Sequence, residues 1–277
     1  MANMHLKHML IDTHCHFDFA AFDGQREHIW RECQAQGVDH LVIPGMAPAQ
    51  WPQAAVVAQN YSNIHYAVGL HPYSVNDFSA EPEQLAEALH IWFSDCATRA
   101  TPMPVALGEC GLDGSIDTPL SRQQALLAVQ LRFAAERQLP VLLHGYKAHN
   151  ELLQMLNAYP LPAGGVLHGF SGSVEQALQF WRRGIYLGIG GTVTYARAAK
   201  TRAAVAQLPA EAIVLETDAP DMPLHGYQGL PNSPLRLVEV ARVVADLRGE
   251  DATTVARQTT ENAMRLLRLA EVVKSRV

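Results

Sequence analysis

Histidine and carboxylate side chains, which are common ligands of divalent metal ions, stand at the ends of several short apolar runs in this 277-residue sequence. An unpaired carboxylate or imidazole in such a buried place is costly, and a bound cation would organise these groups. The two histidines of the first run are two residues apart, so they share one face of an extended chain. The candidate metal ligands are His14, His16, Glu109, His144, His168 and Asp218.

The size of this set predicts more than one ion. A single tetrahedral ion that must also hold water has room for about three protein ligands. Six ligands suit two divalent ions roughly 3.5–4 Å apart, bridged by a carboxylate and activating a water for hydrolysis. Ligation rich in imidazole favours zinc, manganese, iron or nickel, and a bridging carboxylate leaves magnesium open.

Five of eight apolar runs in the sequence contain these residues, and each of the eight is continuous rather than alternating, as in strands buried on both faces. Two helices are clearest between them, one over 121–138 with Ser121 as N-cap and one over 173–184 with Gly184 as C-cap. The expected strands are 9–16, 40–46, 64–72, 104–113, 140–145, 164–171, 184–191 and 212–220.

This alternation predicts an α/β fold, a (β/α)8 TIM barrel. A doubly wound open sheet is the alternative that periodicity alone leaves open. The polar strand ends favour the barrel, because the carboxyl ends of barrel strands face the active site. No linker or low-complexity segment divides the chain, so we expect one domain over 1–277, with a loop over 232–249 and a final helix around 261–273.

Charge and composition limit the kinds of molecule that the protein could bind and the compartment in which it could be located. The net charge of −6 argues against a grip on nucleic acid by the whole surface. The four cysteines are far apart with no CxxC motif, which predicts free thiols in a reducing compartment. Neither a signal peptide pattern nor a window of about twenty apolar residues is present. We therefore expect a cytoplasmic protein that has no membrane association and no evident obligate protein partner.

Over nearly its full length, the sequence resembles the TatD-related deoxyribonuclease family of metal-dependent hydrolases, in particular its YjjV-type branch. The motifs that carry the resemblance are IDTHCHFD, VGLHP, GECGLD, VLLHG, LHGFSGS, GIGGTVTYARAAKTR, VLETDAP and PNSP.

The resemblance implies roles for the candidate ligands. One ion would be held by His14, His16, Glu109 and Asp218, and the second by Glu109, His144 and His168, with Glu109 as the bridge. His71 corresponds to a family histidine near the substrate phosphate. The family usually has Ser-Arg after the fifth-strand histidine, whereas this chain has Gly145 and Tyr146, followed by Lys147. Lys147 could supply a point charge in place of the arginine, without its bidentate geometry.

The predicted function is a metal-dependent hydrolase, most simply a deoxyribonuclease that acts on DNA or a small phosphodiester. Asp218 would act as general base and acid. His71, Lys147 and Arg197 are the predicted phosphate contacts, Arg197 lying in the basic segment 195–202. Glu216 is a candidate supporting carboxylate behind the ligands. An amidohydrolase-like hydrolase of small esters, lactones or amides is the alternative, and a non-catalytic metal-binding barrel is a third possibility.

Overall fold

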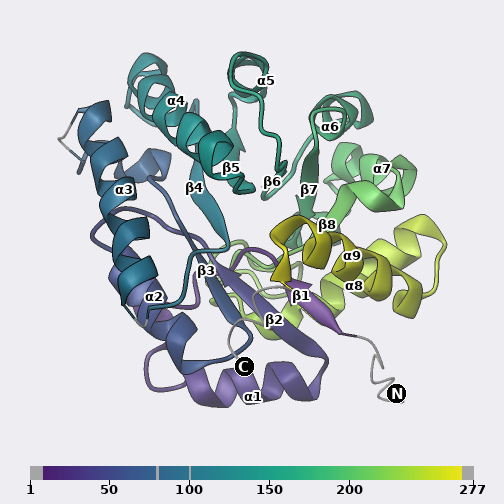
Figure 1. Ribbon diagram of the computed structural model, residues 1–277. Helices are drawn as coiled ribbons and strands as arrows, with labels where there is room; N and C mark the ends of the chain where they lie inside the picture. Colours follow the sequence, from purple (N-terminus) through teal and green to yellow (C-terminus); the bar gives the residue numbers. More distant parts are fainter. Residues whose placement is uncertain (1–8, 79–80, 100, 270–277) are drawn as a thin grey trace.

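A ring of parallel strands forms the centre of the protein, and helices surround it (Figure 1). The computed structural model describes residues 9–78, 81–99 and 101–269. Within these ranges, the strands pair side by side in chain order. They are β1 (Leu10–Asp12), β2 (Val38–Ile43), β3 (Ile64–Val68), β4 (Ala106–Asp113), β5 (Val141–Tyr146), β6 (Gly165–Leu167), β7 (Ile185–Ile189) and β8 (Ile213–Leu215).

The last strand returns to the first. The backbone N–H and the side-chain hydroxyl of Thr13 both donate to the carbonyl oxygen of Leu215, each over 3.0 Å. The Asp218 N–H donates to the His14 carbonyl over 2.8 Å just beyond the strands. These bonds join β8 to β1, which confirms the predicted barrel and excludes the open sheet.

A helix follows each strand and packs on the outside of the ring, as right-handed βαβ crossovers require. The helices are α1 (Arg26–Ala35), α2 (Trp51–Asn60), α3 (Pro82–Thr98), α4 (Leu120–Arg137), α5 (His149–Ala158), α6 (Val174–Trp181), α7 (Ala199–Gln207), α8 (Leu237–Arg248) and α9 (Ala252–Leu267). None of the helices in the described part of the chain is long and apolar enough to cross a membrane.

Below the strand ends, apolar side chains from most strands form a buried cluster, onto which Leu266 and Leu267 of α9 pack. Residues two apart on a strand share a face. Leu142 in this cluster therefore lies one layer below His144, and Val166 lies one layer below His168. The barrel thus carries a polar layer on top of an apolar one, and the polar layer is held by a packed core.

The prediction of a loop over 232–249 is wrong, because this segment contains helix α8. The Ser233 hydroxyl accepts a hydrogen bond from the Leu235 N–H and starts a 3-10 turn that leads into the helix. Leu237, Val240 and Val244 then recur at helical spacing and are buried. Residues that favour a turn at the start of the segment led to the prediction of a loop, although an amphipathic helix follows them.

Three helix boundaries also differ from expectation. Helix α4 begins at Leu120 after Pro119, so Ser121 is inside the helix rather than its N-cap. Helix α6 ends at Trp181, and Gly184 follows three residues later at φ +76°, beyond the cap. Helix α9 begins at Ala252, where the Asp251 side chain caps it by accepting from the Thr253 N–H. The predicted end of this helix near 273 lies outside the described residues.

Candidate metal centre

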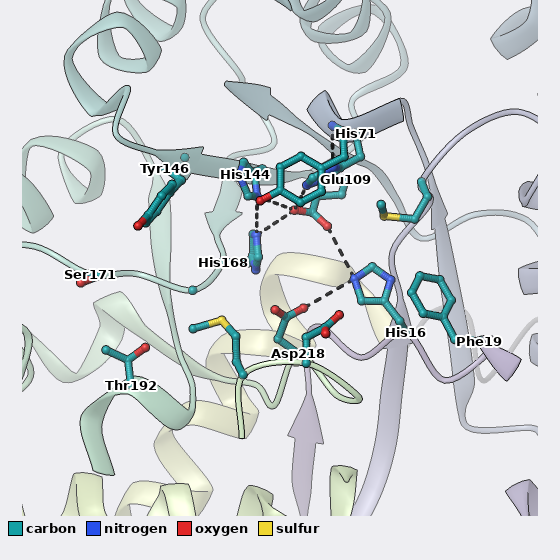
Figure 2. Close-up of a pocket in the computed structure, with 16 residues that line it drawn as sticks. His16, Phe19, His71, Glu109, His144, Tyr146, His168, Ser171, Thr192 and Asp218 are labelled. Atoms are coloured by element: carbon teal, nitrogen blue, oxygen red, sulfur yellow. Dashed lines mark hydrogen bonds and ion pairs between the residues drawn. The ribbon is translucent and has the colours of Figure 1, made fainter. Parts of the chain in front are cut away.

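All six predicted ligands meet at the carboxyl ends of the barrel strands, and Figure 2 shows all of them except His14. They come from five places in the chain that are distant in sequence, and each is buried or nearly so. His14 and His16 follow β1, Glu109 lies within β4, His144 lies within β5, His168 follows β6, and Asp218 follows β8.

Glu109 is at the centre of this cluster, with its two carboxylate oxygens turned in different directions. Oε1 lies 3.0 Å from Nδ1 of His144 and 2.7 Å from Nε2 of His168. Oε2 lies 3.0 Å from Nε2 of His14 and 3.9 Å from Nε2 of His16. A carboxylate that faces two separate pairs of imidazoles has the arrangement of a bridging ligand.

The backbone of β4 explains why Glu109 points inward. Its register with β5 shifts between Gly108 and Cys110, so Glu109 is the extra residue of a bulge. Bulges re-aim a side chain without ending the strand. Gly108 has φ +128°, and a Cβ atom there would lie 2.4 Å from the carbonyl oxygen of Leu142. Only glycine fits this turn of the backbone.

Asp218 completes the other side of the cluster. Its Oδ1 lies 3.5 Å from Nε2 of both His14 and His16, and Figure 2 shows the contact with His16. Burial raises the pKa of this carboxyl, but the hydrogen bond from His16 and the charge of His168 outweigh burial, and its pKa lies below the usual value. The carboxylate is therefore ionised near neutral pH.

His71, predicted as a substrate contact, also reaches the central carboxylate. Its Nε2 lies 3.1 Å from Oε1 of Glu109. Its Nδ1 accepts a hydrogen bond from the Tyr73 N–H over 3.0 Å, so the ring proton is on Nε2 and is donated to Glu109. Although His71, Glu109 and His144 are close enough together to hold a cation, this tautomer presents a proton instead of a lone pair.

Two further carboxylates lie behind the histidines. Oδ2 of Asp113, a residue to which the sequence analysis gave no role, lies 3.0 Å from Nε2 of His144. Glu216, the predicted supporting carboxylate, accepts from the Gly169 N–H, while its Oε1 lies 3.9 Å from Nδ1 of His168. That distance is too long for a hydrogen bond, so Glu216 holds the backbone beside His168 rather than its ring.

The charges in the cluster favour a cation. Burial opposes ionisation of Glu109, but the surrounding imidazoles outweigh it and hold its pKa well below the usual range. Burial lowers the pKa of His168, yet the charge of Glu109 prevails and raises it to about 10. Burial and the charge of His168 lower the pKa of His14 to about 4. Without a metal ion, a proton on His168 balances the buried carboxylate.

The surroundings of His14 suit a divalent metal ion. In the described part of the chain, its fully buried Nε2 has no partner in hydrogen-bond geometry, although carboxylate oxygens of Glu109 and Asp218 lie within 3.5 Å. A buried nitrogen without a hydrogen bond is a rare cost. A divalent ion between this nitrogen and the two oxygens would remove that cost, so the residues present fit a metal ion.

A pocket of about 500 Å³ opens onto the cluster. Its walls carry Phe19, Tyr73 and Tyr146 beside the ligands, and none of the described residues that line it is a lysine or an arginine. Two predicted phosphate contacts, Lys147 and Arg197, are exposed and are not among the lining residues. Their role stays a prediction.

An eight-stranded barrel with a histidine and carboxylate centre at its carboxyl end defines a metal-dependent hydrolase of the TIM-barrel type. Residues 11–268 match the family described as TatD related DNase. The chain belongs to this family, as its motifs predicted, and it is a metal-dependent hydrolase.

Similar proteins cover the whole barrel. The chain is 42% identical over 258 residues to the metal-dependent hydrolase YjjV of Escherichia coli K12, covering 92% of this chain and 96% of YjjV. The crystal structure of YjjV superposes with a TM-score of 0.86 at 40% identity, covering 93% of this chain and 97% of that one. The 3'-5' ssDNA/RNA exonuclease TatD of Pectobacterium carotovorum is 33% identical over 272 residues, covering 94% of this chain and all of the exonuclease (100%).

Proposed function

We propose that this protein is a nuclease that hydrolyses phosphodiester bonds of single-stranded DNA or RNA with two divalent metal ions. The observation that carries the proposal is the position of Glu109, whose Oε1 faces His144 and His168 and whose Oε2 faces His14 and His16. The nucleic acid substrate is supported by relatives named as ssDNA/RNA exonucleases.

The residues divide into two ligand sets around this carboxylate. His14, His16 and Asp218 would hold one ion together with Oε2 of Glu109. His144 and His168 would hold the other together with Oε1. Because imidazole nitrogen predominates, zinc, manganese, iron and nickel suit both positions, and magnesium stays possible through the carboxylates.

Bound divalent ions at such a centre lower the pKa of a coordinated water and neutralise negative charge on phosphoryl oxygens. Asp218, which is ionised and lines the pocket, is placed to accept a proton there and to pass it to the leaving oxygen. The proton that His71 donates to Glu109 fixes the orientation of that carboxylate. The apolar layer below the ligands keeps water from entering the centre from beneath.

Phosphate recognition would come from two sources. His71 lines the pocket next to Glu109, so we propose that its ring lies against the phosphate of the scissile bond while its Nε2 proton stays on Glu109. Lys147 and Arg197 lie outside the pocket lining, so we propose that they contact phosphates further along a bound strand. The net charge of −6 leaves phosphate recognition to such local positive charges rather than to the surface as a whole.

A substrate panel tests the proposal. Metal-supplemented protein should cleave single-stranded DNA or RNA, and Glu109→Gln should abolish the cleavage, because an amide cannot bridge two cations as a carboxylate does. Glu211→Gln, on an exposed turn, is the matched control and should retain activity. Hydrolysis of lactones or uncharged esters without any cleavage of nucleic acid would overturn the proposal.

A further inference from the structure

Two tyrosine rings are exposed at the mouth of the metal pocket. Tyr73 is 57% exposed and Tyr146 is 50% exposed, and both line the pocket. Tyr73 belongs to the 3-10 turn η2 (Pro72–Ser74) after β3, whereas Tyr146 ends β5. Large exposed aromatic side chains at a concave site are typical of surfaces that bind a ligand.

Both tyrosines are close to the metal centre. Each follows one of its histidines by two residues, Tyr73 after His71 and Tyr146 after His144. The Tyr73 ring centroid lies 4.8 Å from that of His71 and 6.0 Å from that of His144. A substrate group next to a phosphate at the metal centre would therefore reach these rings.

The third aromatic ring in the pocket is already engaged. Phe19 stacks on His16 with the ring centroids 4.5 Å apart, and in Figure 2 it lies across the site from Tyr146. Phe19 thus covers a metal ligand. Among the described residues, no ring stacks on Tyr73 or Tyr146 in this way: Tyr73 meets His71 edge to face, and over Tyr146 lies the Lys147 ammonium, so both rings can still receive a ligand.

Compared with the family pattern, this side of the pocket has an aromatic side chain in place of a charged one. Tyr146 stands where the family pattern has an arginine, and no described lining residue replaces that charge. Gly145, between His144 and Tyr146, is a glycine because of packing: a Cβ there would lie 2.9 Å from Leu167 and 3.0 Å from Leu152. The ammonium of Lys147 lies 5.5 Å from the centroid of the Tyr146 ring and adds positive charge beside it.

We propose that Tyr73 and Tyr146 form a stacking surface for a nucleobase of the substrate, next to the phosphodiester bond that is cleaved. The proposal rests on the proposed function and names what the pocket recognises beyond the phosphate. Stacking of a base on an aromatic side chain tolerates every base, because each base has a π face. It also compensates for the missing basic residues, since stacking needs no charge.

Matched dinucleotides test this surface. Metal-supplemented wild-type protein is given thymidylyl-thymidine and two analogues that carry an abasic tetrahydrofuran on one side or the other. We expect kcat/KM to fall roughly tenfold or more when the stacked base is missing on one of the two sides. Equal rates for all three dinucleotides would overturn the stacking surface while leaving the nuclease function standing.

Variants separate the ring from its bulk. Tyr146→Leu and Tyr73→Leu keep an apolar side chain without a π face, so each should lose the preference for the base. Tyr146→Phe should keep it. A base preference that survives in both leucine variants would contradict the proposal.

A binding measurement makes the two proposals separable. A dinucleotide with 2-aminopurine in place of thymine loses fluorescence when the base stacks on an aromatic ring. We expect quenching with wild-type protein and with Tyr146→Phe, recorded before turnover, and little with Tyr146→Leu. If the protein cleaves no dinucleotide, the proposed function fails, and the fluorescence result alone then supports or overturns the stacking surface.

Discussion

Nε2 of His144 lies 3.0 Å from Oδ2 of Asp113, on the opposite side of the imidazole from the Nδ1 atom that faces Glu109. Burial raises the pKa of Asp113, but hydrogen bonds from His144 and Ser115 lower it below the usual value, so the carboxylate is an acceptor. A neutral imidazole has one ring proton. Asp113 keeps that proton on Nε2, which leaves the Nδ1 lone pair directed at the metal centre.

We therefore expect Asp113→Ala to weaken metal binding at the His144 side by about 10–100-fold, the usual effect of removing a carboxylate behind a metal-ligating histidine. Titration with zinc or manganese in competition with a chelator would measure it. Ser115→Ala is the control, because it removes only the hydroxyl hydrogen bond to Asp113. Unchanged affinity in Asp113→Ala would show that His144 needs no such support.

Loss of the bridge should harm the centre more than loss of its neighbour. Glu109→Ala removes the carboxylate that faces both histidine pairs, so metal content and activity should fall together. His71→Ala removes a proton donor and a substrate contact, so metal content should stay close to wild type while turnover or substrate affinity falls. Elemental analysis and kinetics on both variants would decide. Near-normal metal content in Glu109→Ala would mean that the assignment of the bridge is wrong.

Metal binding should release protons. In the metal-free protein, the pKa of His168 is raised to about 10, so its ring is protonated at pH 8. Its nitrogen must lose this proton to bind an ion, and we expect release of about one proton per chain from this residue. Affinity should therefore increase with pH up to about 10. Calorimetric titrations at pH 8 in two buffers of different ionisation enthalpy would count the protons, and no release would refute the expected competition.

The basic segment after β7 should matter for long substrates. The Arg197 guanidinium lies 4.6 Å from the Tyr195 ring centroid, exposed and outside the pocket lining. Arg197→Ala should raise KM for a single-stranded oligonucleotide and make its salt dependence shallower by about one phosphate contact. A dinucleotide or an uncharged ester should be nearly unaffected.

Arg31→Ala, an exposed ion-paired arginine on α1, is the control for a general charge effect. Equal damage by Arg197→Ala to the oligonucleotide and to the ester would show that Arg197 supports the fold instead of binding phosphate.

The metal ligands could be predicted because the carboxyl ends of all strands of a barrel lie at the same face, so a position in the sequence indicates a position in the structure. A histidine or carboxylate at the carboxyl end of a buried strand must lie near its counterparts on the other strands. His144 and His168 illustrate this, since each lies two residues beyond a buried apolar residue on its own strand. The same pattern predicted the eight strands of the barrel, although most strands of the structure are shorter than the expected runs.

Other features depend on contacts that no spacing shows. Asp113 ends the apolar run that also contains Glu109. Only the pairing of β4 with β5 brings the Asp113 carboxylate next to Nε2 of His144. The sequence predicts a loop in place of helix α8, because Ser233 and Pro234 at its start are residue types that favour turns. Lys147 and Arg197 were predicted from their charge and from their positions after the fifth and seventh strands, and neither property indicates whether a side chain faces the pocket.

The most direct test of the account is an anomalous difference map from crystals of the wild-type protein soaked in manganese or zinc. We expect two peaks, one between Glu109 and the His14, His16 and Asp218 side, the other between Glu109 and the His144 and His168 side. The peaks should be roughly 3.5–4 Å apart, the usual spacing of two-metal sites. A single peak, or no peak in the pocket, would contradict the binuclear centre.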